Sequence, residues 1–242
     1  MVQKKLFCIL FGVLCFLTRQ CAESVALVPR AESEKEKDHL KELNIMQLWS
    51  NWFNGQNASS RWMARDFIIK RGYKSILDVG CGLCMEYYGY LNVGYTIAYC
   101  GVDLIKEFVD CAVSNGIKCC QGSVDKLPQD DESYELVYAR HVLEYIDYYE
   151  KALKEMLRVA QKAVVVIFSE KPYIGDDIIN RVLLSGTYIY HNKYNQDKIE
   201  TFVKSIESVK SVRFIDCVFA PGDKDAILFC TGFESMLVIE KV

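Results

Sequence analysis

From residue 73 onward, short apolar runs alternate with stretches whose apolar residues recur at helical spacing. The run Ala163–Phe168 has no polar interruption, which is typical of a strand buried on both faces. Residues 147–160 instead repeat apolar side chains near the period of a helix, at Tyr148, Ala152, Met156 and Val159. This alternation predicts an α/β fold with a doubly wound, mostly parallel sheet flanked by helices.

The same pattern gives the positions of the expected elements in residues 73–242, with seven strands in the sheet. The strands are expected at Ser75–Val79, Thr96–Val102, Ile117–Gln121, Tyr134–Ala139, Ala163–Phe168, Val212–Phe219 and Ser235–Glu240. The helices are expected at Leu104–Ser114, Asp147–Ala160 and Gln196–Ser205. Asn115-Gly116 is a good stop signal for the first of these helices.

The first 26 residues have the pattern of a targeting segment. Two lysines precede the apolar run Leu6–Leu17, which is too short to cross a bilayer comfortably and is typical of a signal peptide. Ser24-Val25-Ala26 offers small residues for cleavage, with Gln20-Cys21-Ala22 as a weaker alternative. We interpret residues 1–26 as a signal peptide or, if uncleaved, an N-terminal anchor. This predicts the secretory pathway, with membrane contact only through this segment; a buried helix in a cytoplasmic protein is the alternative.

Residues 27–72 predict a helical N-terminal extension. The segment Glu32–Glu42 is dense in Glu and Lys and favours an exposed helix start or a linker. Large aromatic residues follow at Trp49, Trp52, Phe53 and Trp62. They favour a docked pair of helices, with a break at Asn54-Gly55.

Composition narrows the class of protein. The chain of 242 residues is 51% hydrophobic and 25% charged, which is ordinary for a globular protein with one core. A net charge of −3 and the lack of a Lys/Arg run argue against nucleic acid as a partner. Of the 11 cysteines, Cys8, Cys15 and Cys21 belong to the leader region. The others could pair in an oxidising compartment or serve as small buried hydrophobes, so they do not settle the location.

Candidate chemistry concentrates where the first expected strands end. Asp78 lies in the first strand, Gly80-Cys81-Gly82 follows at once, and Asp103 ends the second strand. The glycines keep side chains out of the path of a nucleoside, and the following N–H groups can meet an anionic group. A carboxylate at Asp103 can accept hydrogen bonds from both ribose hydroxyls. The pattern predicts a site for an adenosine-containing cofactor.

The spacing of the glycines favours one cofactor over another. A dinucleotide fingerprint would place a third glycine at position 85, where the chain has Met85. We therefore expect no helix start that cradles a pyrophosphate, and an NAD-linked oxidoreductase is disfavoured. Asp78, two residues before the first glycine, is typical of a pocket for a positively charged ligand that bears an amino group. S-adenosylmethionine carries both a sulfonium and an amino group, so it is the favoured cofactor.

Four motifs in this order resemble class I S-adenosylmethionine-dependent methyltransferases of the small-molecule type. They are Ile76–Gly82, Gly101–Asp103, Gly122–Pro128 and Ser133–Val137, followed by matching stretches at 140–146 and 152–159. The resemblance covers residues 73–170 and implies a Rossmann-like domain. The cofactor-binding residues that it implies are Asp78, Gly80, Cys81, Gly82, Asp103, Leu104, Ser123, Val124 and Arg140.

The resemblance also implies roles, and the chain departs from the family at three positions. Asp78 and Gly80 would approach the methionine portion, Asp103 the ribose, and Ser123 with Val124 the adenine. The departures are Cys84, where the family often has glycine, Ser123, where it often has Asp, and Glu135, where it usually has Asp.

Methyl transfer from a sulfonium requires the acceptor to be aligned in a dry site, because the leaving group is neutral. A base is needed only when the acceptor loses a proton. His141 and His191 are the candidates, with Glu144 as a weaker one and with packing or capping as the alternative for His141. Residues 171–195 are the expected acceptor lid, in which aromatic and polar residues suit a small planar or apolar acceptor. A well-packed surface loop is the alternative.

The prediction is an S-adenosylmethionine-dependent methyltransferase that acts on a small-molecule acceptor. The alternative is a catalytically degenerate module that binds the cofactor, or nothing, and serves another protein. Cys81-Gly82-Leu83-Cys84 has the spacing of a redox or zinc motif. Since Cys119-Cys120 are adjacent and no second cysteine pair has zinc spacing, no metal is expected.

Overall fold

The computed structural model describes residues 59–146, 149–184, 187–217 and 234–242. The expected leader at 1–26 and most of the extension at 27–72 lie outside the described residues, as do the expected break at Asn54-Gly55 and part of the strand predicted at Val212–Phe219. The described end of the extension is the helix α4 (Ser59–Arg71). None of the helices in the described part of the chain has the length and apolarity that a membrane span requires.

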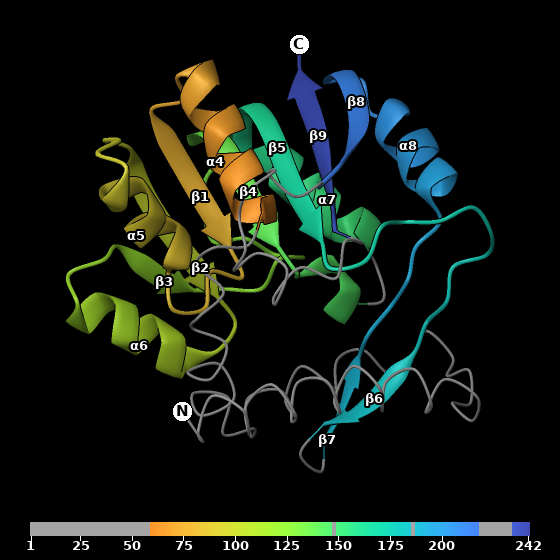
Figure 1. Cartoon of the computed structure of the whole chain (residues 1–242), viewed down its shortest axis with the longest axis horizontal. Coiled ribbons are helices and arrows are strands. Elements are labelled where there is room, and N and C mark those ends of the chain that lie inside the picture. The colour runs from red at the N-terminus through yellow and green to blue at the C-terminus, as the bar shows by residue number, and fades with distance from the viewer. Residues whose placement is uncertain (1–58, 147–148, 185–186, 218–233) are drawn as a thin grey trace.

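A seven-stranded sheet with the order β3-β2-β1-β4-β5-β9-β8 forms the centre of the molecule (Figure 1). Its strands are β1 (Ser75–Val79), β2 (Ala98–Asp103), β3 (Cys119–Gln121), β4 (Tyr134–Arg140), β5 (Ala160–Phe168), β8 (Val209–Asp216) and β9 (Ser235–Lys241). The strands β1 to β5 pair in parallel, and β9 is antiparallel to both β5 and β8. The predicted fold class, a mostly parallel sheet flanked by helices, is confirmed.

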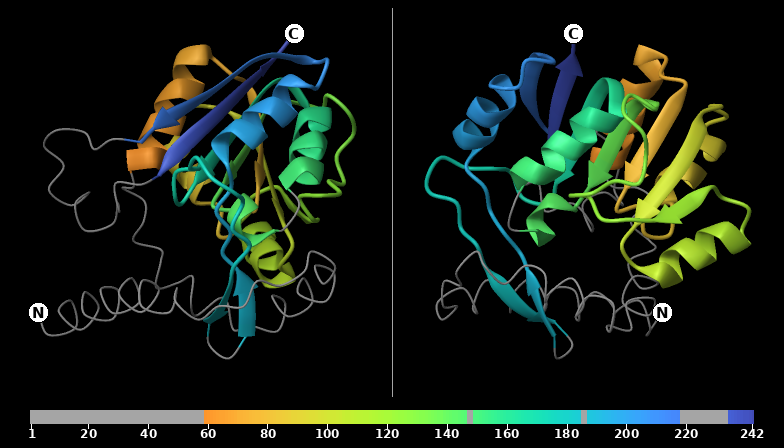
Figure 2. Two further views of the ribbon diagram at one scale, coloured as in Figure 1. Left: turned by 90° about the vertical axis from the view of Figure 1, so that its right-hand side faces the viewer. Right: turned by 180° about the vertical axis from the view of Figure 1, so that it is seen from behind.

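Helices cover both faces of this sheet. They are α5 (Met85–Asn92), α6 (Lys106–Ser114), α7 (Tyr149–Val159) and α8 (Gln196–Lys204). The helices α4 and α5 lie on one face and α7 and α8 on the other (Figure 2), while α6 packs beside β2 and β3. The helices α6, α7 and α8 were predicted within a few residues of their observed bounds.

The helix α5 was not among the predicted elements. It begins at Met85, directly after the glycine turn. The turn closes through the backbone N–H of Cys84, which donates to the carbonyl of Cys81 at 2.8 Å. Cys84 itself takes the left-handed conformation, with φ of 56°, that a glycine would take without strain. The turn therefore holds a non-glycine residue in the left-handed region, which costs conformational energy.

The segment expected as an acceptor lid contains a hairpin that was not predicted. Strands β6 (Arg181–Leu184) and β7 (Thr187–Tyr190) pair antiparallel as a separate two-stranded sheet. The hairpin projects beyond the edge of the main sheet at which the parallel strands end (Figure 1). Its base is held to the domain, because Asn192 donates its N–H to the Glu144 carbonyl at 2.8 Å and Tyr194 donates its hydroxyl to Leu143 O at 2.8 Å.

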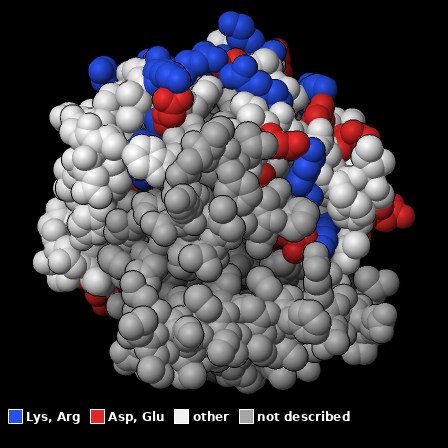
Figure 3. Space-filling model, in the orientation of Figure 1, with Lys and Arg blue, Asp and Glu red and all other residues white. Residues whose placement is uncertain are grey.

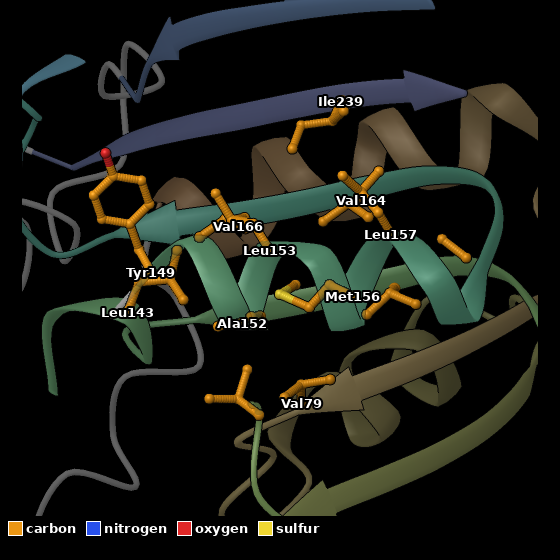
Figure 4. Packing of buried hydrophobic residues seen from close by; sticks show 14 of the residues in the cluster. Val79, Leu143, Tyr149, Ala152, Leu153, Met156, Leu157, Val164, Val166 and Ile239 are labelled. Atoms are coloured by element: carbon orange, nitrogen blue, oxygen red, sulfur yellow. The ribbon is translucent and has the colours of Figure 1, made fainter. Parts of the chain in front are cut away.

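The strands alternate between two different interiors. On the face of α7, the side chains are apolar and fully buried, including Val79, Val166 and Met156 (Figure 4). On the face of α4 and α5, apolar side chains such as Ile76 share the interior with buried polar ones such as Asp78. Because side chains on a strand point alternately to opposite faces, adjacent residues of β1 belong to different interiors.

The edge opposite the hairpin carries most of the visible charge. Figure 3 shows Lys and Arg side chains gathered along the top of the molecule, with carboxylates among them. In the described part of the chain, Arg71 and Arg213 both pair with Glu240, and Lys162 pairs with Glu135. These bases are partnered by carboxylates, in keeping with the net charge of −3.

Candidate functional site

Three loops that were predicted to act together meet at the carboxyl ends of β1, β2 and β3. The backbone N–H groups of Gly80 and Cys81 donate to the carbonyl of Val102, at 2.7 and 3.1 Å. The N–H of Gly122 donates to the carbonyl of Asp103 at 2.9 Å. Parallel pairing of neighbouring strands brings these loops to one edge of the sheet, which is where open α/β sheets bind ligands.

Asp103 is the polar centre of this edge. Its carboxylate oxygens accept hydrogen bonds from Gly82 N at 2.8 Å and from Ile105 N at 2.9 Å. The residue is only 7% exposed, and burial raises the pKa of its carboxyl group to about 6 although these hydrogen bonds lower it. An ionised carboxylate accepts up to about four hydrogen bonds, so Asp103 has capacity for a further donor.

The two glycines of the turn are required for different reasons. Both have positive φ, 67° at Gly80 and 52° at Gly82. A Cβ at Gly80 would lie 2.4 Å from Cγ2 of Val142, so this glycine lets the loop after β4 approach closely. A Cβ at Gly82 would meet no atom within 4 Å, so the space beside this glycine is open.

Asp78 lies beneath the turn in a buried polar network. Its carboxylate accepts a hydrogen bond from the Tyr99 hydroxyl at 2.6 Å. Burial raises its pKa well above the usual range, and the nearby charge of Glu86 adds to this effect. Glu86, at the start of α5, is 3% exposed and pairs with Arg61 and Arg65 of α4. The network thus ties both helices of this face to the glycine turn.

The loop predicted to flank adenine lies beside the end of β2. The hydroxyl of Ser123 donates to the carboxylate of Asp125, and Val124 is buried at 7% exposure. Leu104 is joined to the same region, because its carbonyl accepts a hydrogen bond from the Gln121 side chain at 3.0 Å. The structure therefore brings Ser123, Val124 and Leu104 to the edge that also carries Asp103.

Arg140 and His141 follow β4 and share one carboxylate. Glu234 Oε1 lies 2.7 Å from Nη2 of Arg140 and 2.7 Å from Nε2 of His141. Burial and then the charge of Arg140 lower the pKa of His141. Burial alone would raise the pKa of Glu234, but the hydrogen bond with His141 and the charge of Arg140 outweigh it and lower this pKa to about 2.

The other base candidates lie near this group. Tyr145 belongs to the short 3₁₀ helix η4 (Leu143–Tyr145). The ring of His191 packs edge-on against the ring of Tyr145, and their centroids are 6.2 Å apart. Glu144 is 2% exposed, and one of its carboxylate oxygens accepts a hydrogen bond from Ser169 N at 2.7 Å. Of the expected lid residues, Asn192 and Tyr194 are buried and anchor the hairpin.

Two partners at this edge escaped sequence reasoning. Glu234 is more than 90 positions from Arg140 and His141, and no motif links them. Cys119 was set aside because it does not have zinc spacing to Cys81 and Cys84, but the sulfurs of all three lie within 4.8 Å of one another. The expectation that no metal binds was drawn from linear spacing alone, whereas the fold brings the sulfur of Cys119, which is far away in the sequence, to those of Cys81 and Cys84.

Comparison with known proteins agrees with this geometry. Residues 77–168 match the family described as a methyltransferase domain. This part of the chain, which includes the glycine turn and Asp103, is similar to methyltransferase domains. A structure of an S-adenosylmethionine-dependent methyltransferase from Mesorhizobium loti superposes with a TM-score of 0.55 at 13% identity, covering 76% of this chain and 98% of that one. At this identity the likeness shows the fold.

Curated methyltransferases match part of the chain. Norajmaline N-methyltransferase from Rauvolfia serpentina is 34% identical over 110 residues, which are 40% of this chain and 36% of that protein. The mitochondrial ubiquinone biosynthesis O-methyltransferase of Candida albicans is 22% identical over 183 residues, 66% of this chain and 55% of that protein. The chain thus spans about a third to a half of the length of these relatives.

Proposed function

We propose that the methyltransferase domain binds S-adenosylmethionine at the carboxyl edge of β1 to β3 and transfers its methyl group to a small-molecule acceptor. The observation that carries the proposal is the junction of the glycine turn with Asp103, through the hydrogen bond from Gly82 N at 2.8 Å. The match to the methyltransferase family and the N- and O-methyltransferases among the relatives support the reaction class.

The residues present fit this cofactor. Open space beside Gly82 leaves room for a ligand against the turn, and the Asp103 carboxylate has capacity for a ribose hydroxyl. Asp78, Gly80 and Cys81 would border the methionine portion, Ser123 and Val124 the adenine. Arg140 would lie at the far side of the site, where its guanidinium is held by Glu234.

When bound, S-adenosylmethionine supplies an electrophilic methyl group and leaves as a neutral thioether. The chain has to orient the acceptor and exclude water. Since the Glu234 carboxylate can only accept hydrogen bonds, Nε2 of His141 carries the proton between them and Nδ1 is left to accept another. The lowered pKa of His141 keeps the ring neutral at physiological pH, as a base for a hydroxyl or ammonium acceptor requires. His191 is the second candidate for this role.

Titration calorimetry of the full chain with S-adenosylmethionine tests the cofactor assignment. The variant Asp103→Asn keeps the size of the side chain but removes its charge, and we expect about 10- to 100-fold weaker binding, the equivalent of a hydrogen bond to a charged group. The matched control is Asp110→Asn, at an exposed ion pair with Lys106 on α6, which should bind like the unaltered protein.

The outcomes separate the enzyme from a degenerate module. Failure of the unaltered protein to bind S-adenosylmethionine at millimolar concentration would contradict the proposal. Equal binding by the Asp103 and Asp110 variants would show that the site lies elsewhere. Incubation with a metabolite extract and a labelled methyl donor then tests transfer. A protein that binds the donor but labels no small molecule is a binding module and not a methyltransferase.

A further inference from the structure

Three cysteine sulfurs converge beside the glycine turn from separate parts of the chain. Cys81 lies within the turn, Cys84 precedes α5, and Cys119 begins β3. All three sulfurs lie within 4.8 Å of one another, and those of Cys81 and Cys119 are 3.6 Å apart. Cys81 and Cys84 are buried, whereas Cys119 is partly exposed, so the cluster is reached from the β3 side.

The backbone makes room for this cluster. Gly101 lies on β2, directly opposite Cys119 in the register. A Cβ at Gly101 would lie 2.6 Å from the sulfur of Cys81 and 3.1 Å from that of Cys119. Any larger residue at position 101 of β2 would therefore displace the sulfurs of Cys81 and Cys119. The absence of a side chain at this one position lets thiols from both sides of the strand come together.

Cys84 is held in a conformation that disfavours it. Its φ of 56° belongs to the left-handed region, which costs a non-glycine residue about 1–2 kcal/mol. Its side chain is fully buried among the other thiols and does not cap α5. Strain that is retained at a site where glycine would relieve it is a signal of function.

The groups around the cluster suit a cation. The thiol groups of Cys81 and Cys84 both hydrogen bond to Cys119, so the three sulfurs form one contiguous set of ligands. The carboxyl groups of Asp78 and Asp103 lie close enough to act electrostatically on these cysteines. Cysteine ligates metals as the thiolate, so metal binding would release protons from these thiols.

We propose that Cys81, Cys84 and Cys119 form a binding site for a thiophilic d¹⁰ cation, for which Zn²⁺ is the probe. Zinc–sulfur bonds of about 2.3 Å place the sulfurs of a tetrahedral site about 3.8 Å apart. The separation of 3.6 Å between Cys81 and Cys119 is close to this value. Three protein ligands leave one coordination position open, which water fills. Cys81 also borders the proposed cofactor site, so the test measures metal binding directly and does not depend on methyl transfer.

Cobalt substitution in the full chain tests the site. The protein is reduced, stripped with a chelator and titrated under nitrogen with Co²⁺, whose thiolate complexes show charge-transfer and d–d absorption; Zn²⁺ is then added as competitor. We expect one equivalent to bind and Zn²⁺ to displace it. Each of C81S, C84S and C119S should weaken binding by more than about 100-fold, because even loss of an outer partner of a ligand costs 10- to 100-fold.

The control is C111S, which removes a thiol from α6 and should bind Co²⁺ as the unaltered protein does. It is needed because the chain has 11 cysteines. A second variant, Cys119→Ala, acts at the partly exposed position and keeps the test valid if the buried variants fail to fold. Absence of thiolate–cobalt absorption in the reduced protein overturns the proposal. Binding that survives in C119S and C119A overturns it as well.

Discussion

The two faces of the sheet are built from alternate residues of the same strands, yet their interiors differ. The face of α7 buries apolar side chains, of which Leu153 and Met156 are completely inaccessible (Figure 4). The face of α4 and α5 buries Glu86 between two arginines and Asp78 against a tyrosine. Burial of apolar surface stabilises the fold without directional demands, whereas buried charges stabilise it only while their partners are present.

The comparison indicates that the two faces have different roles: one carries the candidate site and the other the apolar core. The alternation of β1, β2 and β4 places Asp78, Asp103 and Arg140 on the polar face, where the glycine turn and the cysteine cluster also lie. Residues one position away, such as Val79 and Val102, belong to the apolar face. Changes on the polar face should therefore affect both stability and ligand binding, and changes to the residues of the apolar face that pack under α7 only stability.

Removing the charge of Glu86 should have the largest effect. Glu86→Gln leaves Arg61 and Arg65 without their buried counter-charge, which costs about 3–5 kcal/mol in the free energy of unfolding. Urea denaturation measures the loss. Asp110→Asn, at an exposed pair, should change it by less than about 1 kcal/mol. Equal losses in the two variants would show that the buried ion pairs contribute no more to the free energy of unfolding than an exposed pair.

On the apolar face, Met156→Ala should cost about 3 kcal/mol in the free energy of unfolding, because it opens a cavity among residues that cannot fully collapse. Val113→Ala, at a side chain that is 55% exposed, should stay within about 0.5 kcal/mol. Both variants should bind S-adenosylmethionine normally at a temperature where they are folded. A selective loss of S-adenosylmethionine binding in the Met156 variant would contradict the separation of roles between the two faces.

Acid should destabilise the protein through Glu234 and His141. The pKa of Glu234 is about 2 in the folded protein against 4.5 normally, so its contribution is present above pH 4.5 and is lost as the pH falls toward 2. At neutral pH this amounts to at most about 3 kcal/mol. The pKa of His141 is also lowered, so protonation of the unfolded chain below about pH 6.5 acts in the same direction.

The measurement is urea unfolding of the unaltered protein and Glu234→Gln between pH 7.5 and 3. The difference between the two should be largest at neutral pH and shrink as the pH falls, because the protonated carboxyl group resembles the amide. A difference that stays constant with pH would show that Arg140 and His141 do not hold the carboxylate in its charged form.

The smallest effect is expected at Gly82. Gly82→Ala should cost about 1–2 kcal/mol from its positive φ alone, because a Cβ there meets no atom within 4 Å. Gly80→Ala should cost about 1–3 kcal/mol more, since its Cβ would overlap Val142. Despite its smaller cost, Gly82→Ala should weaken S-adenosylmethionine binding, which calorimetry measures. Unchanged binding would show that the open space beside Gly82 is not part of the cofactor site.

Much of the fold was predictable because its signals are local. The apolar run of β5 and the helical spacing of α7 lie within short stretches, so their positions were anticipated within a few residues. The hairpin of β6 and β7 was missed although Ser185-Gly186 is a turn signal between its two apolar runs, because the segment was interpreted only as an acceptor lid. The helix α5 was not predicted, and no glycine marks its start, because Cys84 takes the left-handed conformation there.

The sequence by itself determined the α/β class, the glycine turn and the acidic residue after the second strand, because each depends on neighbours a few positions away. Only the tertiary structure decided which distant residues meet there. Parallel pairing of β2 and β3 carries Cys119 to Cys81, and the closing strand β9 brings Glu234 to His141. Strand order and register set these contacts, and linear spacing contains neither, so the sulfur cluster and the shared carboxylate became visible only in the folded chain.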